Sequence, residues 1–277
     1  MTITRQDIQK FRQRTGAGIT VCKQVLIEAE GDSDKALELL RKKGQKVADK
    51  RASKATTEGL VLAKVNEEAD YGVIIALGCE TDFVANNEAF RELAQNIINA
   101  ALAHRPTSLE ALIQLEVAGR TFEEEITSVI GKMGENIILS AYDTLSSQVV
   151  VPYVHLGNKL GVLVALQGVQ GTHIVEAGRN IAMQVAAMDP IAIDEDSVDP
   201  AIVANELDIA REQASHKAKL PDVLDKIVQA KLQKFYKEKT LLGQLFIKNN
   251  KLTVAQYLTQ ADPKLSITSF KRIMVGS

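Results

Sequence analysis

The chain has 277 residues, of which 45% are apolar and 25% charged, so it is long and apolar enough to bury a core as one large or two modest domains. Its formal net charge of -2 hides an asymmetry, because residues 1–55 carry 13 Lys/Arg against 7 Asp/Glu and the remainder carries 20 against 28. With no apolar run of membrane-spanning length, no secretory signal and only two cysteines, we expect a cytoplasmic protein in which Cys22 and Cys79 are reduced packing residues.

Three short helices are predicted within the first 45 residues, over about 4–14, 19–29 and 33–43. The stretch "TGAG" ends the first helix, Gly31 ends the second, and Gly44 is expected to end the third. The following "QKVADKRASKATTEG" is basic and nearly free of large apolar residues, which fits either a solvated helix or a linker. Residues 1–55 are therefore predicted to be a three-helix module with a basic linker.

Beyond residue 58 the apolar pattern changes to period two, which predicts two antiparallel strands, followed by a helix over 87–103 and a third strand after "KMGENI". The same layout then recurs, and "GVIIAL" at Gly72 resembles "GVLVAL" at Gly161. We expect an α+β fold with a duplicated core of three-stranded antiparallel sheets. The predicted subdomains are 56–146 and 147–197 with 241–277.

Residues 198–240 interrupt the second copy of the repeat. They are charged, contain no glycine and show helical periodicity on both sides of Leu220 and Pro221. We predict an inserted helical hairpin that projects from the core, with apolar positions left over to seat a partner.

No motif in the sequence brings together residues that could carry out covalent chemistry. The four histidines, His104, His155, His173 and His216, fall in separate predicted elements without metal-ligand spacing. The glycine-rich "TGAGIT" lacks the third glycine and the preceding strand of a dinucleotide site. We therefore predict a protein that is not an enzyme, with no cofactor and no metal site.

Two features favour binding instead. The segment "RKKGQKVADKRASK" suits phosphate contacts, so a nucleic-acid or ribosome-associated module is one hypothesis, although the segment has no aromatic residue for base stacking. The other feature is Phe83 in "GCETDFVANNEAF", in a chain with seven Phe, five Tyr and no Trp. On the pattern alone, Phe83 either begins the core stripe of the next helix or points outward as an interface anchor, and Asp82 is also a candidate helix N-cap.

Several segments resemble the elongation factor Ts family in the same order along the chain. They are "FRQRTGAGITVCKQVLIEAEGDSDKALELLRKKG", "CETDFV", "KMGENI", "HLGNKLGVLVAL", "IAMQVAA" and "GQLFIKNNKLTVAQYL". The sequence departs from the family pattern at Leu245, where proline is expected, and at Gln184, where histidine is usual. The resemblance spans essentially the whole chain.

The resemblance implies a guanine nucleotide exchange factor for elongation factor Tu, which it binds in the GDP-bound and nucleotide-free forms. The N-terminal module would be similar to the ubiquitin-associated fold and the insertion to the family's coiled-coil hairpin, with self-association through the hairpin or the core as a further expectation. No membrane contact and no direct nucleic-acid contact is expected.

The resemblance also implies which residues bind the partner. Phe83 would insert between two helices of the partner's nucleotide-binding domain and disturb its magnesium and phosphate site. The full predicted set is Arg12, Thr15, Gly16, Ala17, Gly18, Thr81, Asp82, Phe83, Val84, Met133, Gly134 and His155.

Overall fold

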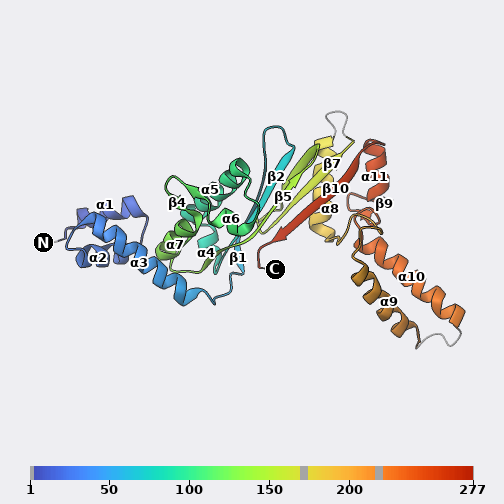
Figure 1. The fold of residues 1–277 in the computed structure, drawn as a ribbon, viewed down its shortest axis with the longest axis horizontal. Coiled ribbons are helices and arrows are strands. Elements are labelled where there is room, and N and C mark those ends of the chain that lie inside the picture. The colour runs from blue at the N-terminus through green and yellow to red at the C-terminus, as the bar shows by residue number, and fades with distance from the viewer. Residues whose placement is uncertain (1–2, 169–173, 216–220, 277) are drawn as a thin grey trace.

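The computed structural model describes residues 3–168, 174–215 and 221–276, and it has the predicted α+β fold, with helices on small antiparallel sheets (Figure 1). The N-terminal helices lie at one end of the molecule and the inserted helices at the other (Figure 1). Two of the histidines considered above, His173 and His216, lie outside the described residues. Within those residues, no helix combines the length and apolarity that a membrane crossing requires.

The N-terminal helices are α1 (Arg5–Thr15), α2 (Ile19–Glu28) and α3 (Ser33–Arg51). Thr4 and Asp7 form a capping box at the start of α1, and the carboxylate of Asp32 accepts from two backbone N–H groups at the start of α3. Their shared core includes the buried side chains of Phe11, Cys22, Val25, Leu26, Ala36 and Leu40. Cys22 and Cys79, which the sequence predicts to be reduced packing residues, are both free and buried.

The third helix does not end at Gly44, and the prediction of an end at Lys43 is wrong. α3 continues to Arg51, and Gly44 lies inside it at the point where it crosses α7 (Phe122–Met133). A Cβ on Gly44 would come within 2.9 Å of the Thr127 carbonyl oxygen, and one on Gly131 within 2.7 Å of the Cα of Gly44. Glycine is therefore required here by the close approach of two backbones and not by a helix end.

Two three-stranded antiparallel sheets form the centre of the molecule. The first has the order β1 (Glu58–Val65), β2 (Tyr71–Cys79), β5 (Ile137–Ser146), and the second β10 (Ser266–Met274), β7 (Leu160–Gln167), β6 (Val149–Val154). In each sheet a hairpin is completed by a strand that follows later in the chain, as the internal repeat predicts. Short pairs are added by β3 (Glu116–Val117) with β4 (Arg120–Thr121) and by β8 (Leu245–Phe246) with β9 (Asn249–Thr253).

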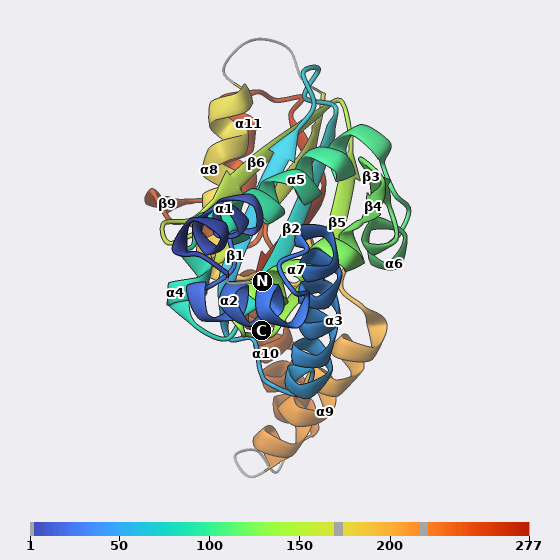
Figure 2. The same ribbon diagram turned by 90° about the vertical axis from the view of Figure 1, so that its left-hand side faces the viewer.

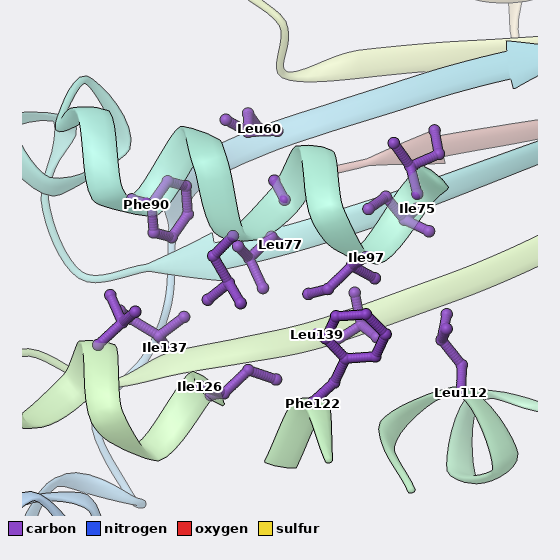
Figure 3. Packing of buried hydrophobic residues seen from close by; sticks show 14 of the residues in the cluster. Leu60, Ile75, Leu77, Phe90, Ile97, Leu112, Phe122, Ile126, Ile137 and Leu139 are labelled. Carbon is purple, nitrogen blue, oxygen red and sulfur yellow. The ribbon is translucent and has the colours of Figure 1, made fainter. Parts of the chain in front are cut away.

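Helices cover the outer faces of the two sheets, which pack against each other. α5 (Glu88–His104), α6 (Leu109–Ile113) and α7 cover the first sheet, whereas α8 (Ile174–Met188) and α11 (Val254–Ala261) cover the second. Figure 3 shows Phe90 and Ile97 of α5 and Phe122 of α7 directed at Leu77 and Leu139 of the first sheet. The space between the sheets is filled by an apolar cluster with members from both, among them Val61, Ile74, Val150, Leu163 and Ala165. Because both of its faces are covered, β2 is buried along its whole length.

The inserted segment contains α9 (Pro200–Ser215) and α10 (Pro221–Lys239), which pack on each other through Ala210, Ala214 and Val228. The pair projects from the core at the end of the molecule opposite the N-terminal helices (Figure 1). Its predicted connection at Leu220 falls in a segment outside the described residues.

Candidate functional site

The turn after β2 presents an aromatic ring to solvent. β2 ends at Cys79, and a single helical turn, α4 (Asp82–Ala85), follows. Within it Val84 and Ala85 are buried in the core of the first sheet, whereas Phe83 is 84% exposed. The burial of its neighbours fixes the direction of the ring, since adjacent residues of a helical turn point to different sides. Asp82 is the first residue of α4, and the N-cap is Thr81.

A carboxylate from the end of α7 clamps this turn. The backbone N–H and the Oγ1 of Thr81 donate to the two carboxylate oxygens of Glu135, at 3.0 and 2.6 Å. Hydrogen bonds to a charged acceptor are stronger than those between neutral groups. The residue before α4 is thus tied to a segment 54 positions further along the chain, so that Phe83 stands on a braced turn.

A second clamp lies next to the first. Glu80 accepts from the backbone N–H of Asn136 at 2.7 Å and from Nη1 of Arg51 at 2.8 and 2.7 Å. The Asn136 N–H and then the Arg51 guanidinium hold the pKa of Glu80 below its usual value. Nδ2 of Asn136 also donates to the carbonyl of Lys54, at 2.9 Å. The end of α3, the β2–α4 turn and the end of α7 are therefore joined.

Sequence reasoning selected Met133 and Gly134 of the "KMGENI" segment as partner-binding residues, and it did not identify the residues that brace the Phe83 turn. Met133 is half-buried, and Gly134 ends α7 in the left-handed conformation with φ 75°. The residues that hold the Phe83 turn are Glu135 and Asn136, which follow them. The sequence did contain a signal for these bracing residues. A carboxylate and an amide directly follow a glycine that ends a helix, and such side chains can accept and donate hydrogen bonds.

The sulfur next to this turn is not a nucleophile. Cys79 is buried and its Sγ donates to the carbonyl of Thr81 at 3.2 Å. Burial raises the pKa of the Cys79 thiol to about 12, and the charges of Glu135 and Glu58 act in the same direction. The thiol therefore stays protonated and serves packing.

The predicted residues of the N-terminal turn divide into two groups. Arg12, Gly16 and Gly18 are exposed, but Thr15 and Ala17 are 5% and 0% exposed. Oγ1 of Thr15 donates to the Phe11 carbonyl at 2.8 Å and accepts from the Ala17 N–H at 3.4 Å. Thr15 and Ala17 therefore hold the turn together from inside. At Gly16 and Gly18 the turn exposes its backbone.

This turn lies against the end of α7. An ideal Cβ on Gly16, whose φ is 69°, would be 3.8 Å from Nζ of Lys132. Lys132 precedes Met133 and Gly134, so the N-terminal turn, the end of α7 and the Phe83 turn form one continuous region. Figure 2 shows α1, α2 and α4 on the side of the molecule that carries the N-terminus.

His155 belongs to the second sheet, and its turn reaches the start of β1, where Lys159 pairs with Glu58, the residue opposite Cys79. His155 is exposed in the turn between β6 and β7, and its Nδ1 is 2.8 Å from the hydroxyl of Tyr153 in its own hairpin. The same turn contacts β1, since Asn158 accepts through its carbonyl from the Val61 N–H at 2.6 Å. Leu156, which sequence reasoning missed, is 92% exposed. An apolar residue directly before the turn glycine in "HLGNK" was the signal for it.

The second departure from the family pattern is accommodated in the core. Gln184 on α8 is fully buried, donates to Gln244 Oε1 at 3.0 Å and to the Leu245 carbonyl at 3.1 Å, and accepts from the Ile247 N–H at 2.8 Å. Its polar atoms are thus satisfied, and they fix the β8–β9 hairpin to α8. Leu245 itself is exposed.

Among residues 3–168, 174–215 and 221–276, no group of three or more His, Cys, Asp and Glu side chains is arranged to hold a metal ion. The region around Phe83 instead combines an exposed aromatic anchor, a braced turn and accessible backbone. These features are typical of a protein-binding factor.

Comparison with known proteins gives the family. The family described as "Elongation factor TS" matches residues 80–277. The chain is 58% identical over its full length to the elongation factor Ts of Amoebophilus asiaticus (strain 5a2), and all of that relative is covered. It is 44% identical over 99% of both chains to that of Christiangramia forsetii, and 44% over all of both chains to that of Porphyromonas gingivalis (strain W83). The chain belongs to the elongation factor Ts family and is a translation elongation factor.

Proposed function

We propose that this protein binds elongation factor Tu in its GDP-bound and nucleotide-free forms and promotes the release of GDP. It acts through contacts and makes no covalent bond, so it is an exchange factor and not an enzyme. It acts in the cytoplasm, where translation takes place. Family membership supports the partner, and the exposed ring of Phe83 is the observation that supports the mechanism.

The proposed contact surface has two parts. The first is the ring of Phe83 with the neighbouring carboxylate of Asp82, which enters between two helices of the partner's nucleotide-binding domain. The second is the N-terminal turn, where Arg12 supplies a charged side chain and Gly16 and Gly18 supply backbone. Thr15, Ala17 and Val84 are buried, and in this proposal they position the contacts without making them.

Rigidity of the Phe83 turn matters for the energetics. A side chain that is already held in its bound direction loses less conformational entropy on association. The hydrogen bonds from Thr81 to Glu135 supply this preorganisation. The contact energy of Phe83 is then available to move the magnesium and phosphate ligands of the partner.

Exchange follows from reciprocal coupling. If this protein binds the nucleotide-free partner more tightly than the GDP-bound partner, GDP and this protein weaken each other's binding by the same free energy. A difference of about 5.5 kcal/mol moves a two-state equilibrium from 1:99 to 99:1. One desolvated aromatic anchor contributes about 2–4 kcal/mol, so Phe83 with its surroundings provides a large part of it.

The predicted domain partition fits this use. We propose that residues 1–55 and the core subdomain 56–146 carry the contact near the nucleotide, with Met133 and Gly134 at their junction. In the second subdomain, residues 147–197 with 241–277, the second contact is made by the turn that includes His155. The hairpin 198–240 provides a further contact or self-association.

The experiment is release of fluorescent GDP from purified elongation factor Tu, with this protein at increasing concentration. The release rate should rise and saturate. An unchanged release rate in the presence of a folded, monodisperse sample would refute the proposal.

A nucleic-acid role for the basic segment finds less support. Lys42, Lys43 and Arg51 form ion pairs with Glu38, Glu28 and Glu80, so part of the positive charge on α3 is already neutralised. Retention of RNA by this protein at physiological salt, lost on neutralising Lys46 and Lys50, would revive that role.

A further inference from the structure

A cavity lies at the junction between the N-terminal helices and the first sheet's helices. It is about 240 Å³ and is lined by residues of α1, α3, α7 and the short strand β4. A neighbouring cavity of about 360 Å³ shares Arg41, Arg120 and Ser128 with it. The close crossing of Gly44 and Gly131 holds the two sides of this junction together.

The smaller cavity is lined by four cations and by no carboxylate. The cations are Arg14 on α1, Arg41 on α3, Arg120 on β4 and Lys132 on α7, and the hydroxyl of Ser128 lies among them. Two of these cations belong to the N-terminal helices and two to the core. The larger cavity differs, because Glu123 and Glu124 line it.

The positive charge in the smaller cavity is poorly neutralised. Arg14 pairs with Asp34 at 3.2 Å, but both side chains are mostly exposed and such pairs contribute little. Within the part of the chain that the structure describes, Arg41, Arg120 and Lys132 have no carboxylate within 4.0 Å. The pKa of Lys132 is lowered by burial and then by the charge of Arg120, while Glu92 and Glu125 oppose this shift more weakly.

We propose that this cavity is a binding site for a small phosphate-type polyanion of the diphosphate class. Guanidinium groups bind phosphate through paired N–H donors, and lysine binds it as a point charge. Four cations match the charge of two linked phosphates better than that of one. A bound diphosphate contacts the N-terminal helices through Arg14 and Arg41 and the core through Arg120 and Lys132, so it stabilises their docking.

Two sources supply this chemistry, namely free pyrophosphate and the diphosphate of a nucleotide such as GDP. The site is independent of the proposed exchange, because it lies wholly within this chain. Its test therefore uses this protein alone, without elongation factor Tu.

The experiment is calorimetric titration of the full chain with inorganic pyrophosphate, GDP and sulfate at constant ionic strength, together with thermal unfolding. We expect saturable binding of pyrophosphate with a 1:1 stoichiometry and a rise in Tm of roughly 5 °C at a hundredfold excess over Kd. Tighter binding of GDP assigns the site to nucleotides, and binding of pyrophosphate alone assigns it to the free anion. Sulfate that binds as tightly as pyrophosphate would overturn the diphosphate class.

Variants separate a binding role from a structural one. Lys132→Met and Arg41→Gln should each weaken pyrophosphate binding at least tenfold, whereas Lys46→Gln, the same charge change on an α3 residue outside the cavity, should not. Without anion, Lys132→Met should unfold at the same or a higher temperature than the parent, because a half-buried cation has been removed. Equal responses of Lys132→Met, Arg41→Gln and Lys46→Gln to pyrophosphate would contradict the site.

Discussion

The two turns proposed to meet the partner differ in what they present. The Phe83 turn exposes one large side chain and is held by the carboxylates of Glu80 and Glu135. The turn at Gly16 buries the side chains of Thr15 and Ala17 and exposes backbone. The first is built as a side-chain anchor, and the second as a shaped surface whose position depends on how the N-terminal helices dock.

Family resemblance treats these turns alike, whereas their physical roles are distinct. Substitution at Phe83 should remove binding energy and leave the fold unchanged. Substitution around the N-terminal turn should instead affect partner binding indirectly, by changing the packing and the position of that turn.

Replacing Phe83 by alanine should weaken binding to elongation factor Tu by about 2–4 kcal/mol, or roughly 30- to 1000-fold. The ring is 84% exposed, so its loss leaves no cavity and Tm should change by less than about 2 °C. Calorimetric titration of the partner and thermal unfolding measure the two quantities.

The matched control is Val175→Ala, which shortens an exposed apolar side chain on α8 of the second half of the core. It should leave binding within a factor of about two. Equal loss of binding in Phe83→Ala and Val175→Ala would mean that Phe83 is not an anchor.

Gly44→Ala should destabilise the protein by about 1–3 kcal/mol, because the new methyl group meets the Thr127 carbonyl oxygen at 2.9 Å. The usual effect has the opposite sign, since alanine in place of glycine inside a helix stabilises it by about 1 kcal/mol. Denaturant unfolding distinguishes the two signs. A stabilised Gly44→Ala variant would show that α3 and α7 do not cross as closely as described.

Glu135→Ala should loosen the Phe83 turn without changing Phe83 itself. Loss of two hydrogen bonds to a charged acceptor costs about 1–2 kcal/mol locally, so amide exchange across residues 81–86 should accelerate by roughly tenfold. Hydrogen–deuterium exchange read by mass spectrometry measures this, with Glu124→Ala on the exposed side of α7 as control. Unchanged amide protection in Glu135→Ala would show that Glu135 does not hold the Phe83 turn.

The clamp at Glu80 should appear as a small pH dependence of stability. Because the pKa of folded Glu80 is lowered, its contribution is complete above the ordinary glutamate pKa and is lost as pH falls through the lowered value. The parent should exceed Glu80→Gln in stability by about 1 kcal/mol at pH 7, and the difference should vanish in acid. Glu67→Gln, at an exposed position between β1 and β2, is the control. A difference that grows in acid would contradict the assignment.

Much of the fold could be predicted because its determinants are local. Continuous apolar runs mark the two central strands, and the near-identity of "GVIIAL" and "GVLVAL" marks these strands as equivalent, each buried on both faces. The end of α3 was predicted wrongly at Gly44 because a glycine within a helical pattern can mark either a helix end or a close backbone contact. Only the position of α7, about 80 residues further on, decides between them.

The site could be predicted only in part, for the same reason. The motif identified Phe83, but its direction depends on Val84 and Ala85 entering the core of the first sheet. The bracing by Glu135 and the gathering of Arg14, Arg41, Arg120 and Lys132 depend on tertiary placement, which has no local pattern. The domain partition and the set of partner-binding residues stay predictions.

The central claim concerns the environment of one ring, and it can be measured directly. A fluorinated phenylalanine placed at position 83 reports by ¹⁹F NMR whether the ring is in water or in protein. In the free protein we predict a solvent-exposed resonance that shifts between H₂O and D₂O, and in the saturated complex with elongation factor Tu a displaced, broadened resonance without that solvent shift. A resonance that keeps its position and solvent shift in the saturated complex would contradict the role of Phe83.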